Sequence, residues 1–244
     1  MSGFGFGGVY AVCYTGNPRR HESLMAELRR VGLTAEVVWG FPTEYKQFML
    51  SKIPHIRNLD VHPGSWGATL CHYAAIKIAY ERGQDNVLIV EDDCRFLRDI
   101  DAVHRRLLAA PEGWDILMLD HFDDKPVEVG SPGAVDGWAQ VKSTRSVACY
   151  VLRRKAMERL IDMYESPVSG KYPNPMMRAA DNWIEDFLLG RDVSVYVAVP
   201  NIAVQQDCGD SSNFGDTVKR IYAGLGVDRS LYAPGISGMD AVKG

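Results

Sequence analysis

Short apolar segments alternate with amphipathic helical segments along most of the chain, and this alternation constrains the fold more than any other feature. Apolar runs rich in β-branched and aromatic residues predict buried strands, whereas apolar residues at three- to four-residue spacing predict helices. The expected strands are 8–16, 35–41, 86–93, 114–120, 139–154 (continuous or broken near Ser143) and 193–200. The expected helices are 18–31, 65–82, 99–109, 155–164 and 177–190.

Residues that favour helix ends stand where this pattern needs them. Asn17 can cap the first helix ahead of Pro18, and Ser65 can cap the second. Strands that alternate with helices indicate an α/β fold with a mostly parallel central sheet flanked by helices. No linker or repeat interrupts the pattern, so the 244 residues are expected to form a single domain, with an irregular tail from about residue 201.

Composition is that of an ordinary globular protein, with 46% hydrophobic and 24% charged residues. The net charge of −4 gives no reason to expect nucleic acid or an anionic membrane surface as a partner. No apolar run approaches the roughly 20 residues of a membrane span, and the start of the chain lacks the features of a signal peptide. The 5 cysteines are widely spread, without a CxxC pair, which predicts reduced, mostly buried thiols of a cytoplasmic protein.

The segment DNVLIVEDDCRF, residues 85–96, ends an apolar run on three adjacent carboxylates, Glu91, Asp92 and Asp93. Like charges this close disfavour each other's ionised form, so either a bound cation or full solvation must accommodate them. A further acid, Asp120, ends the next expected strand. Because ligands in α/β sheets bind beyond the carboxyl ends of the strands, these acids mark a candidate site.

A divalent cation is the ligand that such acids favour. Mg²⁺ and Mn²⁺ take oxygen ligands, typically one or two protein carboxylates together with substrate phosphates. Side chains alternate along an extended segment, so Glu91 and Asp93 are expected to share one face, with Asp92 on the other. The pair could then reach one metal ion or one nucleotide, and a solvated acidic turn is the alternative.

Other candidate residues carry weaker signals. Arg19 and Arg20 lie near a helix start, where cations are disfavoured, so either a bound anion or a solvated surface pair explains them. His72 lies on an amphipathic helix and is expected to pack beneath the site, with a hydrogen bond to backbone or to an acid near Glu91. Buried thiols are the expectation for Cys13 and for the other cysteines, in place of a catalytic nucleophile.

With these residues assembled, the chain resembles glycosyltransferase family 25, which includes lipooligosaccharide and collagen galactosyltransferases. The resemblance spans most of residues 8–213, and VLIVEDDCRF is its most specific segment, similar to the family's Glu-Asp-Asp motif. GATLCH is similar to the family's Gly-Cys-x-Leu-Ser-His motif, with Ala68 and Cys71 substituted. The other similar segments are TGNPRRHESL, which lacks the usual Asn-Leu-Asp, GWDILMLD, ADNWIEDFLL and VPNIAVQQDCGDSS.

The resemblance implies a GT-A-like fold, a UDP-sugar donor, a glycan or other hydroxyl acceptor, and inversion at the anomeric carbon of a hexose, galactose or glucose. It also implies a divalent metal, usually Mn²⁺ with Mg²⁺ as the substitute, held by Asp93. Glu91 would share the metal or contact the ribose. The remaining nucleotide contacts implied by this similarity are Thr15, Arg19, Arg20 and Asp92.

An inverting transfer also needs a base for the acceptor hydroxyl. The candidates are Asp120 and Asp181, and helix capping is the alternative reading of Asp181. Asp207 and Asp210 are rivals in the tail. The family's tail often offers a late metal ligand, for which this chain has Gln205, Gln206, Asp207, Asp210 or Asn213. The low apolar content of residues 205–216 predicts a segment that is mobile without ligand and closes over a bound donor.

Two other functions stay open at this point. A nucleotidyltransferase or phosphohydrolase could use the same acidic metal site on phosphates. A glycosyltransferase-like protein could instead bind a sugar nucleotide or glycan without turnover. An assay of sugar nucleotides against nucleoside triphosphates, with and without Mn²⁺, separates glycosyl transfer from the first of these two functions.

Overall fold

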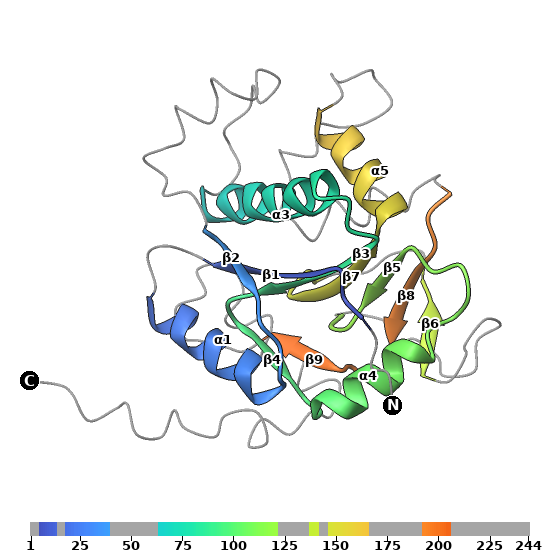
Figure 1. Ribbon diagram of the computed structural model, residues 1–244, viewed down its shortest axis with the longest axis horizontal. Helices are drawn as coiled ribbons and strands as arrows, with labels where there is room; N and C mark the ends of the chain where they lie inside the picture. Colours follow the sequence, from blue (N-terminus) through green and yellow to red (C-terminus); the bar gives the residue numbers. More distant parts are fainter. Residues whose placement is uncertain are drawn as a thin grey trace, which may run out of the picture. The chain divides into compact units, whose positions relative to one another are not determined.

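A computed structural model describes residues 5–13, 18–39, 63–121, 137–141, 146–165 and 192–205 (Figure 1). Its strands are β1 Gly8–Cys13, β2 Glu36–Trp39, β3 Asn86–Glu91, β4 Cys94–Phe96, β5 Ile116–Met118, β6 Trp138–Gln140, β7 Cys149–Arg153, β8 Val195–Ala198 and β9 Ala203–Gln205. Its helices are α1 Pro18–Arg30, α3 Pro63–Glu81, α4 Ile100–Leu108 and α5 Arg154–Glu165.

The central sheet has seven strands in the order β2-β1-β3-β7-β5-β8-β6. Strands β1, β2 and β3 run parallel, and β7 runs antiparallel to its neighbours β3 and β5. Strand β8 is parallel to β5, and the edge strand β6 is antiparallel to β8. Five of the seven strands therefore point one way, with β7 and β6 reversed, and the predicted α/β class with a mostly parallel sheet is confirmed.

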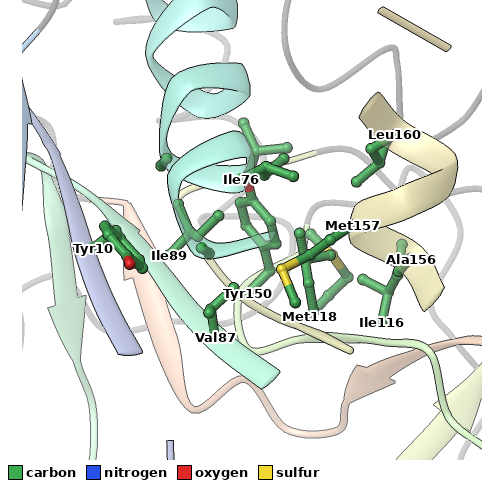
Figure 2. Packing of buried hydrophobic residues seen from close by; sticks show 14 of the residues in the cluster. Tyr10, Ile76, Val87, Ile89, Ile116, Met118, Tyr150, Ala156, Met157 and Leu160 are labelled. Atoms are coloured by element: carbon green, nitrogen blue, oxygen red, sulfur yellow. The ribbon is translucent and has the colours of Figure 1, made fainter. Parts of the chain in front are cut away.

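Helices cover both faces of this sheet, so its central strand β3 is buried on both sides. Along β3, Val87 and Ile89 join a core with α3 and α5, which Figure 2 shows from close by. The alternate residues, Leu88 and Val90, join a second core with α1 and α4. A continuous apolar run such as β3 is what a strand buried on both faces requires.

A small second sheet pairs β4 with β9 and holds the acidic turn in place. Cys94 lies opposite Gln205 and Phe96 opposite Ala203. The expectation of an irregular tail from about residue 201 is thus wrong for 203–205, which form a strand. Three residues are too few to show a strand period, so only the pairing with β4 reveals it.

Two other expectations need correction. The segment 139–154, expected as one strand that is continuous or broken near Ser143, forms two strands at separate places in the sheet, since β6 pairs with β8 while β7 lies between β3 and β5. Helix α3 begins at Pro63, ahead of the expected cap Ser65; proline is tolerated in a first turn because its missing N–H has no helical partner there.

Gly32 and Gly83 follow the ends of α1 and α3 with positive φ angles of 69° and 71°, a conformation that favours glycine at helix ends.

The helix expected over 177–190 lies outside the described residues. Of the helices in the described ranges, none is long and apolar enough to cross a lipid bilayer.

Candidate active site at the carboxyl ends of the strands

The carboxyl ends of β3 and β5 bring the predicted acids to one edge of the sheet. Glu91 ends β3, Asp92 and Asp93 follow in a turn, and Asp120 lies two residues beyond β5. The two strands point the same way because both run antiparallel to β7 between them. The charges of Asp93 and Glu91 both help to raise the pKa of Asp120, so the acids interact electrostatically. The convergence expected from sequence is therefore present in the fold.

Arg20, in the first turn of α1, pairs with both acids of the turn. Its Nη2 lies 2.5 Å from Oδ1 of Asp92 and 2.6 Å from Oδ2 of Asp93. The expectation that Asp92 and Asp93 point to opposite faces is therefore wrong. Strand β3 ends at Glu91, and the side-chain alternation of a strand does not continue into a turn.

Asp93 is a buried carboxylate, with 4% of its surface exposed. Its Oδ2 accepts hydrogen bonds from Arg20 and, at 2.9 Å, from Nε2 of Gln205. Its buried Oδ1 accepts none from any residue in the described ranges. Burial is the main cause that raises the pKa of Asp93, and the charge of Glu91 adds to it, against the opposing effect of Arg20. Such a carboxylate is ready to be stabilised by a cation.

Glu91 turns towards α3, on the other side of the sheet from Arg20, so the expectation that Glu91 and Asp93 share one face is also wrong. Its Oε1 lies 2.9 Å from Nε2 of His72, whose Nδ1 lies 2.8 Å from the hydroxyl of Tyr150. A neutral histidine has one donor and one acceptor nitrogen. Opposite the Glu91 carboxylate, the Nε2–H of His72 therefore donates a hydrogen bond, and Nδ1 of His72 accepts one from the Tyr150 hydroxyl. The prediction that His72 packs under the site and bonds an acid there is confirmed, and the acid is Glu91 itself.

Asp120 is fully buried and held through both oxygens. Ser146 Oγ donates to Oδ2 at 2.7 Å, and Asn201 Nδ2 donates to Oδ1 at 3.3 Å. Burial raises the pKa of Asp120 to about 8; the Ser146 hydrogen bond opposes this rise, and the nearby carboxylates add to it. Ser146 has a φ of 109°, a conformation that costs a non-glycine residue free energy and that often occurs at functional sites.

The acids fit a hard divalent cation of the Mg²⁺ or Mn²⁺ type. Within the described ranges, no three or more histidines, cysteines, aspartates and glutamates gather into a metal-holding group. Proteins usually hold these ions through one or two carboxylates, with substrate phosphates completing the shell. The buried Oδ1 of Asp93 is an acceptor that the described residues leave unused, whereas the second expected ligand, Glu91, is bonded to His72.

The remaining predicted site residues are placed less closely or not at all. Arg19 is exposed on α1, so the described structure brings Arg20, and not Arg19, to the acids. Gln205 reaches Asp93, as one of the residues considered for a late ligand. The others lie outside the described residues: Thr15, Asp181, Gln206, Asp207, Asp210 and Asn213.

Three residues of the site had no sequence signal that assigns them to it. Tyr150, Ser146 and Asn201 are separated from their partners by 78, 26 and 81 positions. Asn201 lies in the segment VPNIAVQQDCGDSS, but no local pattern assigns any of the three to its partner, because these contacts join positions far apart in the chain.

The described cysteines are buried thiols, as expected. Cys13, Cys71, Cys94 and Cys149 are free and buried. Burial, with the charge of Asp92 as a smaller cause, raises the pKa of Cys13 to about 12. A thiol that holds its proton this firmly does not act as a nucleophile near neutral pH.

No protein-family model matches the chain, and no curated protein matches it. Solved structures with a similar arrangement include glycosyltransferases and nucleotidyltransferases. A glycosyltransferase involved in glycosylation of the major capsid of PBCV-1 is 10% identical, with a TM-score of 0.44 over 88% of this chain and 99% of its own.

Two further structures represent both classes. Mouse xyloside xylosyltransferase 1 is 9% identical, with a TM-score of 0.40 over 75% of this chain and 80% of its own. The 4-diphosphocytidyl-2C-methyl-D-erythritol synthase of Anaerococcus prevotii is 11% identical, with a TM-score of 0.42 over 90% of this chain and 98% of its own. Similarity at this level carries no information about a shared substrate or mechanism.

Proposed function

We propose that the chain is a metal-dependent, inverting glycosyltransferase with a GT-A-like fold, which moves a hexose, galactose or glucose, from a UDP-sugar to a hydroxyl of a glycan or another acceptor. The observation that carries the proposal is the gathering of Glu91, Asp93 and Asp120 with Arg20 at one edge of the sheet. Buried acids beside a single guanidinium suit a ligand that joins a cation to phosphate oxygens. The resemblance of the EDD segment to family 25 supports glycosyl transfer as the reaction.

Asp93 and Glu91 are the residues that would hold the cation, Mn²⁺ or Mg²⁺, which would act as a Lewis acid on the leaving diphosphate. Arg20 already lies at Asp92 and Asp93 and would bring a second positive charge to the same phosphates. The His72–Tyr150 pair would hold Glu91 in one orientation. Each of these residues would therefore bind or position the donor.

In the transfer itself, the acceptor oxygen would bond to the anomeric carbon as the bond from that carbon to the diphosphate oxygen breaks. The acceptor proton would pass to a carboxylate. Asp120 is one candidate, but burial raises its pKa to about 8, so it holds a proton near neutral pH, and its complete burial keeps it from an acceptor in this conformation. Asp181 is the other candidate, and the Asp120→Asn and Asp181→Asn variants separate the two by their loss of turnover with donor binding retained.

A thermal-shift experiment tests the proposal. The wild-type protein is melted with UDP-glucose or UDP-galactose, in Mn²⁺ or in EDTA, beside Asp93→Asn and a control, Asp101→Asn, on the exposed start of α4. A donor at about 100 times its Kd stabilises by roughly 2.7 kcal/mol, which raises the Tm by about 5–10 °C. We expect this rise only with Mn²⁺, in wild type and Asp101→Asn, and not in Asp93→Asn.

Other results would redirect the assignment. A rise with nucleoside triphosphates but with no sugar nucleotide would point to nucleotidyl transfer. Donor binding without release of UDP, even at high protein concentration and with acceptors present, would point to a binding protein without turnover.

A further inference from the structure

A large aromatic side chain stands exposed at the same sheet edge as the acids. Trp39 ends β2 with 45% of its surface exposed; the other large apolar side chain of the described residues that is exposed, Leu108, lies on α4. In the sheet register, Trp39 pairs with Cys13, and the preceding residue of β1, Val12, pairs with Glu91. Trp39 is thus level with the start of the acidic turn and two strands away, about 10 Å across the sheet.

The first turn of α1 connects this tryptophan to the acids. The ring of His21 lies 4.8 Å from that of Trp39, centroid to centroid, at an interplanar angle of 49°. The residue before it, Arg20, pairs with Asp92 and Asp93. The first turn of α1 therefore contacts Trp39 through His21 and the two aspartates through Arg20.

We propose that Trp39, with His21 beside it, is the stacking surface for the nucleobase of a nucleoside diphosphate sugar. The diphosphate would then lie at Arg20 and Asp93, one ribose away. This inference rests on the proposed function and deepens it. Every nucleobase has a π-face, and stacking on an aromatic side chain holds it with little dependence on base identity.

Two observations separate this arrangement from a chance surface aromatic. Single exposed apolar side chains are common and need no explanation, but this one contacts the residue next to Arg20. Asp93, at the other end of this arrangement, independently indicates a ligand, because its buried Oδ1 accepts no hydrogen bond from a described residue. The ends of β2 and β3 lie two strands apart, about 10 Å, which a single phosphate ion does not span.

Binding of two probes to the whole chain tests the inference. Isothermal titration calorimetry compares UDP with pyrophosphate, both with Mn²⁺, on wild type, Trp39→Ala, Trp39→Phe and the control Leu108→Ala. Pyrophosphate has no base, so it reports the metal and Arg20 end alone. ADP and GDP, added in the same way, test whether stacking tolerates other bases.

We expect Trp39→Ala to weaken UDP binding by about tenfold or more, the size of one base–aromatic stack, and to leave pyrophosphate binding unchanged. Trp39→Phe should restore most of the loss, and Leu108→Ala should change neither probe. UDP binding that is unaffected in Trp39→Ala, or UDP and pyrophosphate weakened equally, would overturn the stacking surface while leaving the proposed function in place. Absence of binding by UDP, ADP, GDP and pyrophosphate to wild type would overturn both.

Discussion

Asp120 holds a proton at pH values where an ordinary aspartate is ionised, because burial raises its pKa to about 8. In the unfolded chain the same carboxyl titrates near its usual value of about 3.9. Between these two values the folded state binds a proton that the unfolded state lacks. The free energy of unfolding therefore falls as the pH rises through this interval.

This linkage predicts the effect of replacing Asp120. We expect wild type to lose stability between pH 5 and pH 8 in EDTA more steeply than Asp120→Asn does. Over that interval wild type should lose at least about 1 kcal/mol more than Asp120→Asn, or roughly 2–4 °C more in Tm. Melting both proteins across this pH range is the measurement. Parallel curves would mean that the Asp120 carboxyl does not change its proton affinity on folding.

At the scale of elements, one side chain of α3 joins two strands of the sheet. His72 is fully buried and bonds Glu91 at the end of β3 and Tyr150 in β7. These contacts lie beneath the acidic turn, where β3 leaves the sheet. The orientation of Glu91 thus depends on how α3 packs against β3 and β7.

Replacement of His72 should lower stability and activity together. His72→Ala leaves two buried polar groups without their partner and opens a cavity, which should cost about 3 kcal/mol. Tyr150→Phe removes one hydroxyl, keeps the bond to Glu91 and should cost about 1 kcal/mol, with a smaller loss of turnover. Chemical denaturation and steady-state kinetics give both quantities. Lost turnover at unchanged stability would give His72 a direct catalytic part instead of a positioning one.

At the scale of the whole molecule, Gln205 links the last described strand to the acid site. It pairs opposite Cys94 in the small sheet, and its side chain donates to Asp93. This hydrogen bond favours the ionised form of Asp93, because it lowers the pKa of that carboxyl. A truncation after Gln205 keeps this hydrogen bond to Asp93, and a truncation before Gln205 removes it.

Two truncations use that difference. A chain ending at Gln206 keeps β9, so its Tm should stay within about 2 °C of that of the full chain. The residues that it lacks lie outside the described ranges, and if residues 205–216 close over the donor, as is expected from their composition, transfer should fall by about 100-fold. A chain ending at Val204 also loses the hydrogen bond to Asp93, and should bind Mn²⁺ more weakly near neutral pH. Full transfer by the chain ending at Gln206 would leave the tail without a part in the reaction.

The sequence by itself determined the class of fold, most of the described helices and strands, and the edge of the sheet where the acids lie. These features follow from local periods and from residues at the ends of apolar runs, because burial of one face or both is written into neighbouring positions. The expectation that His72 bonds the backbone or an acid near Glu91 came from the same source, and the structure identifies the partner as Glu91.

Only the tertiary structure decided which groups meet. The separate places of β6 and β7 in the sheet, the strand at 203–205, and the contact of Ser146 with Asp120 depend on which segments become neighbours. Strand pairing joins residues far apart in the chain, and no local period encodes it. The pairing of Arg20 with both Asp92 and Asp93 was also not predictable from the local pattern. These two residues lie in a turn after β3, where the side-chain alternation of a strand no longer holds.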